Sequence, residues 1–152
     1  MAANAPRPTR LHETISALLH SQKQRLTPTR RCIVDVLEAA DRPLTIPEIL
    51  DARPELAQSS AYRNLVVLEQ ARVVHRLVTH ADFARYELAE DLTGHHHHLV
   101  CSNCGRVDDL PATAAVERSV AVAIDEAARH AGFVTEHHRL DLVGLCSDCT
   151  PE

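Results

Sequence analysis

Two pairs of cysteines have the spacing of a metal knuckle. Cys101 and Cys104 are separated by two residues, and so are Cys146 and Cys149. Paired thiolates at this spacing can share one tetrahedral zinc ion, with each sulfur roughly 2.3 Å from the metal. Four cysteine ligands leave no open coordination position, so the predicted zinc is structural. The alternatives are disulfides, which are disfavoured in a chain without an export signal, or four unrelated buried thiols.

Four consecutive histidines, 95–98, lie just before the first knuckle. Alternate side chains of an extended segment face opposite ways, so His95 and His97 can serve one metal site while His96 and His98 serve another. The further ligands at suitable places are Glu117 and His138 for the first site, and Glu87 with His75 or Glu90 for the second. The alternative is a solvated histidine loop with adventitious metal affinity. Cys32 lies within the second predicted helix and is interpreted as a plain buried thiol.

The first half of the chain must position some of these residues, and its pattern predicts four helices and a hairpin. Apolar periodicity and helix-start signals place the helices at about 11–22, 28–40, 46–53 and 60–70. Thr27 and Thr45 can cap the second and third helices, and Ser59 or Ser60 the fourth. Strands are expected at 73–78 and 84–88, joined by a polar turn at 79–83. This is the order of a winged helix-turn-helix. The alternative is a small helical bundle with a hairpin and no nucleic-acid role.

The second half predicts an α/β module after a linker at 89–94. Strands are expected at about 98–101, 106–110 and 138–143, with a long amphipathic helix at 114–130 and Gly132 as its C-cap. Such a small sheet has an open edge and a thin core. Dimerisation would cover both.

Charge separates the two halves. Residues 1–80 carry 11 Lys/Arg against 8 Asp/Glu, and residues 81–152 carry 5 against 13, which gives +3 and −8 and sums to the net charge of −5. Seven of the 11 histidines also lie in the acidic half, and histidines among carboxylates point to divalent cations. No apolar run approaches the roughly 20 residues that span a bilayer, and no secretory signal is present, so a cytoplasmic protein without a membrane partner is expected.

Three segments resemble one known family. Residues 94–110, GHHHHLVCSNCGRVDDL, are similar to the hallmark of the ferric uptake regulator family, a histidine-rich cluster just before a C-x-x-C zinc knuckle. Ser60-Ala61-Tyr62-Arg63 resembles the family's Thr-Val-Tyr-Arg at the start of its DNA-reading helix. Residues 25–30, RLTPTR, resemble the start of an N-terminal helix of the family. The resemblance extends from about residue 11 to 149.

The resemblance implies an α+β fold with an N-terminal winged helix-turn-helix domain and a C-terminal α/β dimerisation domain that contains a four-cysteine zinc site. The expected organisation is a disordered N-terminus at 1–10, a DNA-binding domain at 11–88, a hinge at 89–94 and a metal-binding dimerisation domain at 95–152. The implied function is that of a metal-dependent repressor, which binds palindromic operator DNA as a homodimer and controls metal-uptake genes.

The resemblance also assigns residues. The structural zinc ligands are Cys101, Cys104, Cys146 and Cys149. The dimerisation-domain metal ligands are His95, His97, Glu117 and His138. The regulatory hinge ligands are Glu87, His96 and His98, with His75 expected to complete the set. The DNA contacts are expected from Arg30, Ser59, Ser60, Tyr62 and Arg63.

Departures from the family pattern bear on which metal is sensed. His97 stands where iron-sensing members commonly have Asp, and an all-imidazole pair is softer, which favours Zn²⁺ over Fe²⁺ and the zinc-sensing branch. However, the hinge Cys of some zinc sensors has no counterpart near Glu90, and Pro43 replaces the hinge His of many iron sensors. A metal storage or delivery protein is the main alternative, although it leaves the basic first half unexplained. A zinc hydrolase is disfavoured because it needs an open metal position beside a general base, and no enzyme activity is expected.

Overall fold

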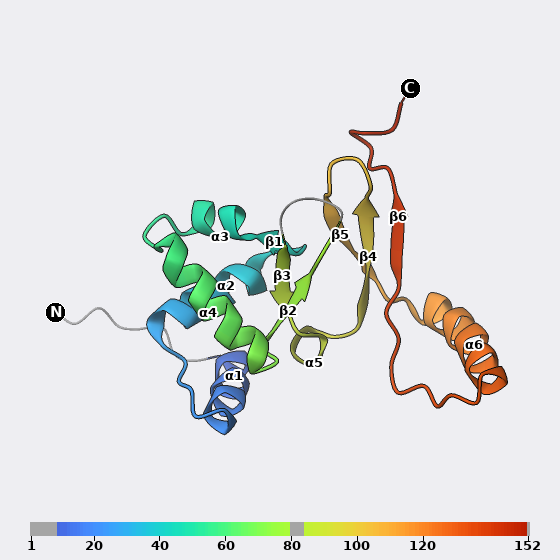
Figure 1. Ribbon diagram of the computed structural model, residues 1–152, viewed down its shortest axis with the longest axis horizontal. Coiled ribbons are helices and arrows are strands. Elements are labelled where there is room, and N and C mark those ends of the chain that lie inside the picture. The colour runs from blue at the N-terminus through green and yellow to red at the C-terminus, as the bar shows by residue number, and fades with distance from the viewer. Residues whose placement is uncertain (1–8, 80–83, 152) are drawn as a thin grey trace. The chain divides into compact units, whose positions relative to one another are not determined.

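The computed structural model describes residues 9–79 and 84–151 and divides the chain into two compact units, Met1–Thr93 and Gly94–Glu152. The first unit contains α1 (Arg10–Ser21), α2 (Pro28–Ala39), β1 (Leu44–Thr45), α3 (Ile46–Ala52), α4 (Gln58–Gln70), β2 (Val74–Leu77), β3 (Arg85–Leu88) and α5 (Glu90–Thr93). The second unit contains β4 (His96–Cys101), β5 (Val107–Pro111), α6 (Ala114–His130) and β6 (Asp141–Gly144) (Figure 1).

Local signals explain where the helices of the first unit begin. The Thr27 hydroxyl accepts a hydrogen bond from the backbone N–H of Arg30, and Pro28 occupies the first turn, where a missing N–H costs nothing. Thr45 and Glu48 form a capping box at α3. At α4 the expectation was wrong: the N-cap is Ala57, which makes no side-chain cap. Ser59 and Ser60 therefore lie inside the first turn of α4.

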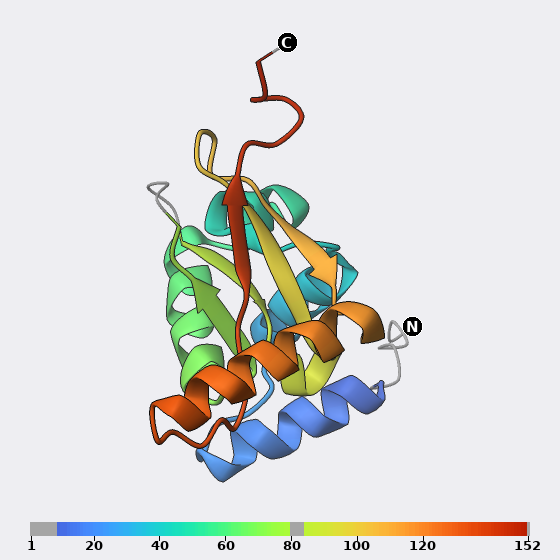
Figure 2. The same ribbon diagram turned by 90° about the vertical axis from the view of Figure 1, so that its right-hand side faces the viewer.

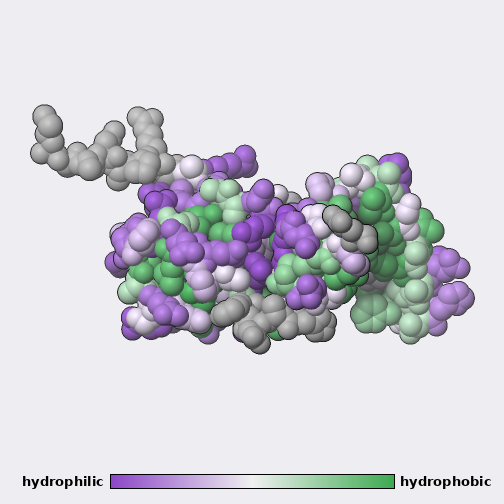
Figure 3. All heavy atoms as spheres, turned by 90° about the horizontal axis from the view of Figure 1, so that it is seen from above, coloured by the Kyte–Doolittle hydropathy of each residue, from purple (hydrophilic) through white to green (hydrophobic). Residues whose placement is uncertain are grey.

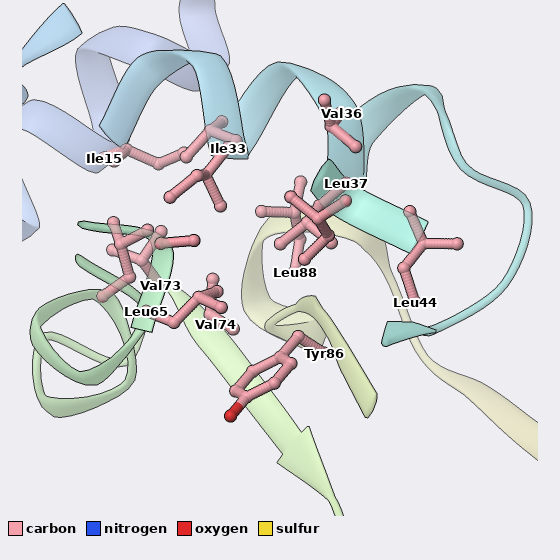
Figure 4. Packing of buried hydrophobic residues seen from close by; sticks show 14 of the residues in the cluster. Ile15, Ile33, Val36, Leu37, Leu44, Leu65, Val73, Val74, Tyr86 and Leu88 are labelled. Carbon is pink, nitrogen blue, oxygen red and sulfur yellow. The ribbon is translucent and has the colours of Figure 1, made fainter. Parts of the chain in front are cut away.

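The first unit packs its helices on a small antiparallel sheet. The strand order is β1-β3-β2, and the short strand β1 was not predicted. Apolar side chains from α1, α2, α4 and the strands form one core, including Ile15, Ile33, Leu65, Val73 and Leu88, all of them at most 2% exposed (Figure 4). Residues 1–8 of the expected disordered terminus and 80–83 of the expected turn lie outside the described residues.

The second unit is a three-stranded mixed sheet with one long helix. Its order is β5-β4-β6, with β4 antiparallel to β5 and parallel to β6. Figure 2 shows α6 crossing the strands of the same unit. None of the described side chains of α6 or β6 is buried. The C-cap of α6 is Ala131, whereas the sequence predicted Gly132. Gly132 is the next residue, and its φ is +66°.

Three further boundaries differ from the sequence expectation. The segment 89–94, expected to be a linker, contains the short helix α5. β4 begins at His96 rather than 98, so three of the four consecutive histidines belong to a strand. β6 begins at Asp141 rather than 138, and His138 precedes it.

Candidate metal centres and DNA-binding surface

The four paired cysteines converge on one point. Their sulfur atoms all lie within 4.8 Å of one another, and the sulfurs of Cys104 and Cys146 are 3.7 Å apart. Sulfurs at the corners of a tetrahedron about 2.3 Å from a zinc ion lie roughly 3.8 Å from each other. A disulfide is much shorter, at about 2.05 Å. The spacing therefore fits a shared tetrahedral ion.

A tight turn after Cys101 helps to hold the thiols in place. Cys101 ends β4, and the turn that follows uses Gly105 at φ +72°, a conformation that favours glycine. Backbone hydrogen bonds from Cys104 and Cys146 lower the pKa of Cys101 to about 6. The Cys146 N–H donates to the Cys101 sulfur at 3.4 Å. Burial and the neighbouring thiols raise the pKa of Cys146 to about 11. Four thiols so arranged favour a cation that replaces their protons.

A second cluster, here called the imidazole cluster, joins His95, His97, Glu117 and His138. Its ligand atoms also lie within 4.8 Å of one another. Nε2 of His97 lies 2.6 Å from Oε1 of Glu117, and Nε2 of His95 lies 3.2 Å from Nε2 of His138. Hydrogen bonding with His97 lowers the pKa of Glu117. His97 is fully buried, and its Nδ1 has no hydrogen-bond partner among the described residues.

The chemistry of this donor set fits a divalent cation. Each neutral imidazole has one acceptor nitrogen and one N–H donor, and an ionised carboxylate only accepts. Three such rings turned toward one carboxylate therefore bring together more acceptor atoms than N–H donors. A divalent metal ion can bind these acceptor atoms together, because imidazole nitrogens and carboxylate oxygens are ligands that such ions accept. The four residues come from β4 and the residue before it, from the first turn of α6 and from the segment before β6. The structure thus brings together the whole predicted set.

The residues predicted for the hinge site divide between the two units. In the first unit, β2 and β3 pair His75 with Glu87, and His75 Nδ1 lies 3.3 Å from Glu87 Oε1. In the second unit, the rings of His96 and His98 lie 5.1 Å apart. Glu87 and His98 are both buried in the structure.

Sequence reasoning missed two acidic neighbours of His98. Asp109 lies opposite His98 in the register of β4 and β5, and its carboxylate is within 4.8 Å of the ligand atoms of His96 and His98. Asp141, at the start of β6, places Oδ1 3.2 Å from Nδ1 of His98. Asp109 could have been predicted, because the turn at the first cysteine pair sets the register of the β4–β5 hairpin and so determines which residue lies opposite His98. Asp141 could not, because the long connection through α6 to the parallel strand β6 has no local sequence feature that predicts its register with β4.

The residues predicted to contact DNA gather at the start of α4 and α2. Ser59, Tyr62 and Arg63 are exposed, and Tyr62 retains 49% of its surface. Arg30 is half-buried: its Nε donates to the Asn64 side chain at 3.0 Å and its Nη1 to the Arg25 carbonyl at 2.6 Å. Ala61, Leu65 and Leu68 meanwhile anchor the opposite face of α4 in the core. The exposed face can therefore enter a groove without disturbing the packing.

A winged helix followed by an α/β unit with a four-cysteine cluster defines a class of metal-binding transcriptional regulators, and comparison with known proteins identifies the family. The model of the ferric uptake regulator family matches residues 21–143. The chain therefore belongs to this family, whose members are metal-responsive, DNA-binding regulators of transcription.

Individual relatives agree. The chain is 31% identical over 144 residues to the ferric uptake regulation protein of Bacillus subtilis, covering 90% of this chain and 93% of the relative. It is 30% identical over 147 residues to the peroxide operon regulator of the same species, covering 91% and 94%.

Solved structures share the fold. The Helicobacter pylori ferric uptake regulator Fur, described as having three functional metal-binding sites, superposes with a TM-score of 0.76 at 21% identity, covering 93% of each chain. A zinc-bound manganese uptake regulator superposes with a TM-score of 0.64 at 25% identity, covering 88% of this chain and 98% of that one. Within the described residues, no helix is both long and apolar enough to cross a membrane.

Proposed function

We propose that this protein is a metal-dependent repressor that binds palindromic operator DNA as a homodimer and controls metal-uptake genes. The observation that carries the proposal is the pairing of a winged helix, whose α4 face is exposed, with two preassembled ligand clusters in the other unit. The proposed domains are 11–88 and 95–152, with a hinge at 89–94. The boundary between the two compact units, after Thr93, supports this division.

In the proposal the four cysteines hold a structural Zn²⁺, and the histidines hold the regulatory metal. Glu87, His96 and His98 are the proposed hinge ligands, joined by His75. The 3.3 Å distance between His75 Nδ1 and Glu87 Oε1 supports His75 as a ligand beside Glu87. The imidazole cluster is the proposed second site. Metal bound at the hinge would restrict the relative motion of the two domains.

Ligand softness favours zinc over iron, most clearly at the imidazole cluster. The imidazole cluster has three nitrogens and one carboxylate, and imidazole-rich sets suit zinc better than the carboxylate-rich sets of harder cations. The carboxylates near His98, Asp109 and Asp141, make the hinge set harder than the sequence indicated. Iron therefore remains in the proposal as the second choice.

An apolar surface on the second unit supports the homodimer. Leu99, Leu142, Val143 and Leu145 are each 40–61% exposed. Figure 3 shows hydrophobic side chains, in green, gathered on the second unit. A sheet of three strands cannot bury these side chains alone, and a second copy would cover them.

One titration tests the proposal against metal storage. A duplex is first selected from a random library by the metal-loaded protein, and its binding is then measured by fluorescence anisotropy with zinc, manganese or, without oxygen, ferrous iron. We expect binding that requires one of these metals, zinc before iron, and that weakens steeply with salt, because phosphate contacts release counterions. A storage protein would take up metal without any metal-dependent change in DNA binding.

A further inference from the structure

A fourth group of possible metal ligands lies in the first unit, far along the sequence from the cysteines and the imidazole cluster. His12 of α1 faces Asp35 and Glu38 of α2, and their ligand atoms all lie within 4.8 Å of one another. The residues three apart on α2 fall on one side of the helix. His12 is 7% exposed, and its Nε2 lies 2.6 Å from Oδ1 of Asp35. A buried imidazole thus points at two carboxylates.

The hydrogen bonds of His12 define its present tautomer. The backbone N–H of Thr9 donates to Nδ1 of His12 at 3.2 Å, and a backbone N–H can only donate. In the neutral ring the proton must therefore be on Nε2, where it is donated to Asp35. The Thr9 hydroxyl lies 2.9 Å from the same Nδ1 and can accept a hydrogen bond from an Nδ1–H. In the other tautomer the Nδ1–H would donate to this hydroxyl and the Thr9 N–H would have to turn away from Nδ1, which leaves Nε2 free to bind a cation.

The surroundings allow an ion to enter. His12 and Asp35 both line an open cavity of about 1000 Å³ that α1 and α2 border together with Arg53. Glu38 is exposed at the edge of the cluster. Two carboxylates balance the charge of a divalent ion, and water from the cavity can complete its coordination. One imidazole with two carboxylates suits a first-row divalent ion.

We propose that His12, Asp35 and Glu38 bind a divalent transition-metal ion that joins α1 to α2. This site is separate from the structural and regulatory sites and lies entirely within the DNA-binding unit. α1 already packs on the core through Ile15 and Leu19. α2 carries Arg30 at its start, so a metal link between the two helices would stiffen the support of a proposed DNA-contacting residue.

The test is the ring tautomer of His12, measured by ¹⁵N NMR on the full chain with zinc in its cysteine site. Before further addition we expect the proton on Nε2. Titration with Zn²⁺ should move it to Nδ1 while Nε2 takes the shift of a metal-bound nitrogen. Because the signal comes from His12 itself, zinc bound at the imidazole cluster or the hinge does not interfere.

Two variants separate a metal site from a structural hydrogen bond. Glu38→Gln removes a ligand at an exposed position, and we expect the zinc affinity read at His12 to fall by at least about tenfold. Glu13→Gln is the matched control, because Glu13 lines the same cavity but is outside the trio, and it should leave the titration unchanged. The proposal is overturned if His12 keeps its Nε2 proton at saturating zinc, or if both variants titrate as the wild type does.

Discussion

The Glu48 carboxylate receives hydrogen bonds from three directions. The Thr45 N–H donates to it at 2.7 Å, Arg42 at 2.8 Å and Arg85 of β3 at 3.2 Å. Burial opposes ionisation, but the hydrogen bonds from Arg42 and Thr45 outweigh it and lower the Glu48 pKa from 4.5 to about 2. A carboxyl whose pKa is lower in the folded state stabilises the fold above its unfolded pKa. We expect this contribution to be lost as the pH falls from about 4.5 toward 2.

The size of the effect follows from partial exposure. About a third of the Glu48 side chain is accessible, so we expect roughly 1 to 2 kcal/mol rather than the full value for a buried pair. Urea unfolding of the wild type and Glu48→Gln at neutral pH and near pH 3 measures it. The difference between the two proteins should shrink at the lower pH. The exposed control Glu13→Gln should match the wild type at both, and a pH-independent difference for Glu48→Gln would contradict the assignment.

Replacing Cys101 with Ser should remove the structural zinc and the dimer together. The free energy of metal binding is part of the free energy of folding at such a site, and Cys146 and Cys149 hold the end of the chain through the shared ion. Zinc content and size-exclusion chromatography measure the two losses. Cys32→Ser is the matched control, since this half-buried thiol lies outside the cluster, and it should keep the structural zinc. A Cys101→Ser variant that stays dimeric without zinc would count against the prediction.

Single residues differ in how far the sequence could identify them. Cys104 and Cys149 were identifiable because two-residue spacing within a knuckle is a local property. The separation of His95 and His97 from their neighbours followed equally from strand alternation. Asp141 could not be found in this way, because its place beside His98 depends on a parallel pairing between β4 and β6 across 43 residues.

At the scale of elements, α4 is proposed to read DNA, and Arg63→Ala tests that role. Arg63 is exposed in the first turn and a half of the helix, where side chains reach base edges or phosphates. We expect weaker operator binding with both metals retained. If Arg63 contacts a phosphate, the loss should be similar for every duplex and the salt slope should fall by about one. Anisotropy titrations at several salt concentrations, with metal analysis of the same samples, measure both.

The matched control for this prediction is Arg118→Ala. Arg118 is an exposed arginine on α6, so the variant makes the same change in charge outside the winged helix. Its operator affinity should remain within a small factor of the wild type. Equal losses in both variants would mean that net charge, and not α4, governs binding. Unchanged binding in Arg63→Ala would remove the support for α4 as the reading helix.

Elements with strong start signals were predicted well, and those without such signals were not. Thr27 with Pro28 and Thr45 with Glu48 fixed the beginnings of α2 and α3. α4 starts at Gln58 after Ala57, which provides no side-chain cap, so the prediction of Ser59 or Ser60 as the cap was wrong. The two-residue strand β1 is too short for periodicity to reveal, and it forms only because β3 pairs with it.

At the scale of the whole molecule, the first 80 residues and the rest of the chain differ in charge and in proposed role. Residues 1–80 carry +3 and residues 81–152 carry −8, so the cationic part holds the proposed DNA contacts and the anionic part holds most metal ligands. The first unit has a continuous apolar core, whereas α6 and β6 of the second have no buried residue among those described. We therefore expect folding of the second unit to depend on bound metal and on a second copy of the chain, and folding of the first unit to depend on them less.

Coupling between the proposed hinge metal and DNA would also act across the whole molecule. The proposed ligands come from both units, with His75 and Glu87 in the first and His96 and His98 in the second. Metal binding would select the DNA-competent members of an ensemble of domain orientations. Such coupling is usually worth about 1 to 3 kcal/mol, or roughly 5- to 150-fold in DNA affinity, and it must be reciprocal. Operator DNA should therefore tighten the regulatory metal by the same factor.

The double variant His96→Ala, His98→Ala should give a folded dimer that keeps its cysteine-bound zinc but no longer responds to added metal. His95→Ala or His138→Ala, which alter only the imidazole cluster, should reduce the response without abolishing it, because the hinge ligands remain. Metal-dependent anisotropy on one operator duplex compares these variants with the wild type, and metal titration with and without that duplex measures the reciprocal effect. If the double variant keeps its full metal response while His95→Ala loses it, the imidazole cluster is the regulatory site and the hinge assignment fails.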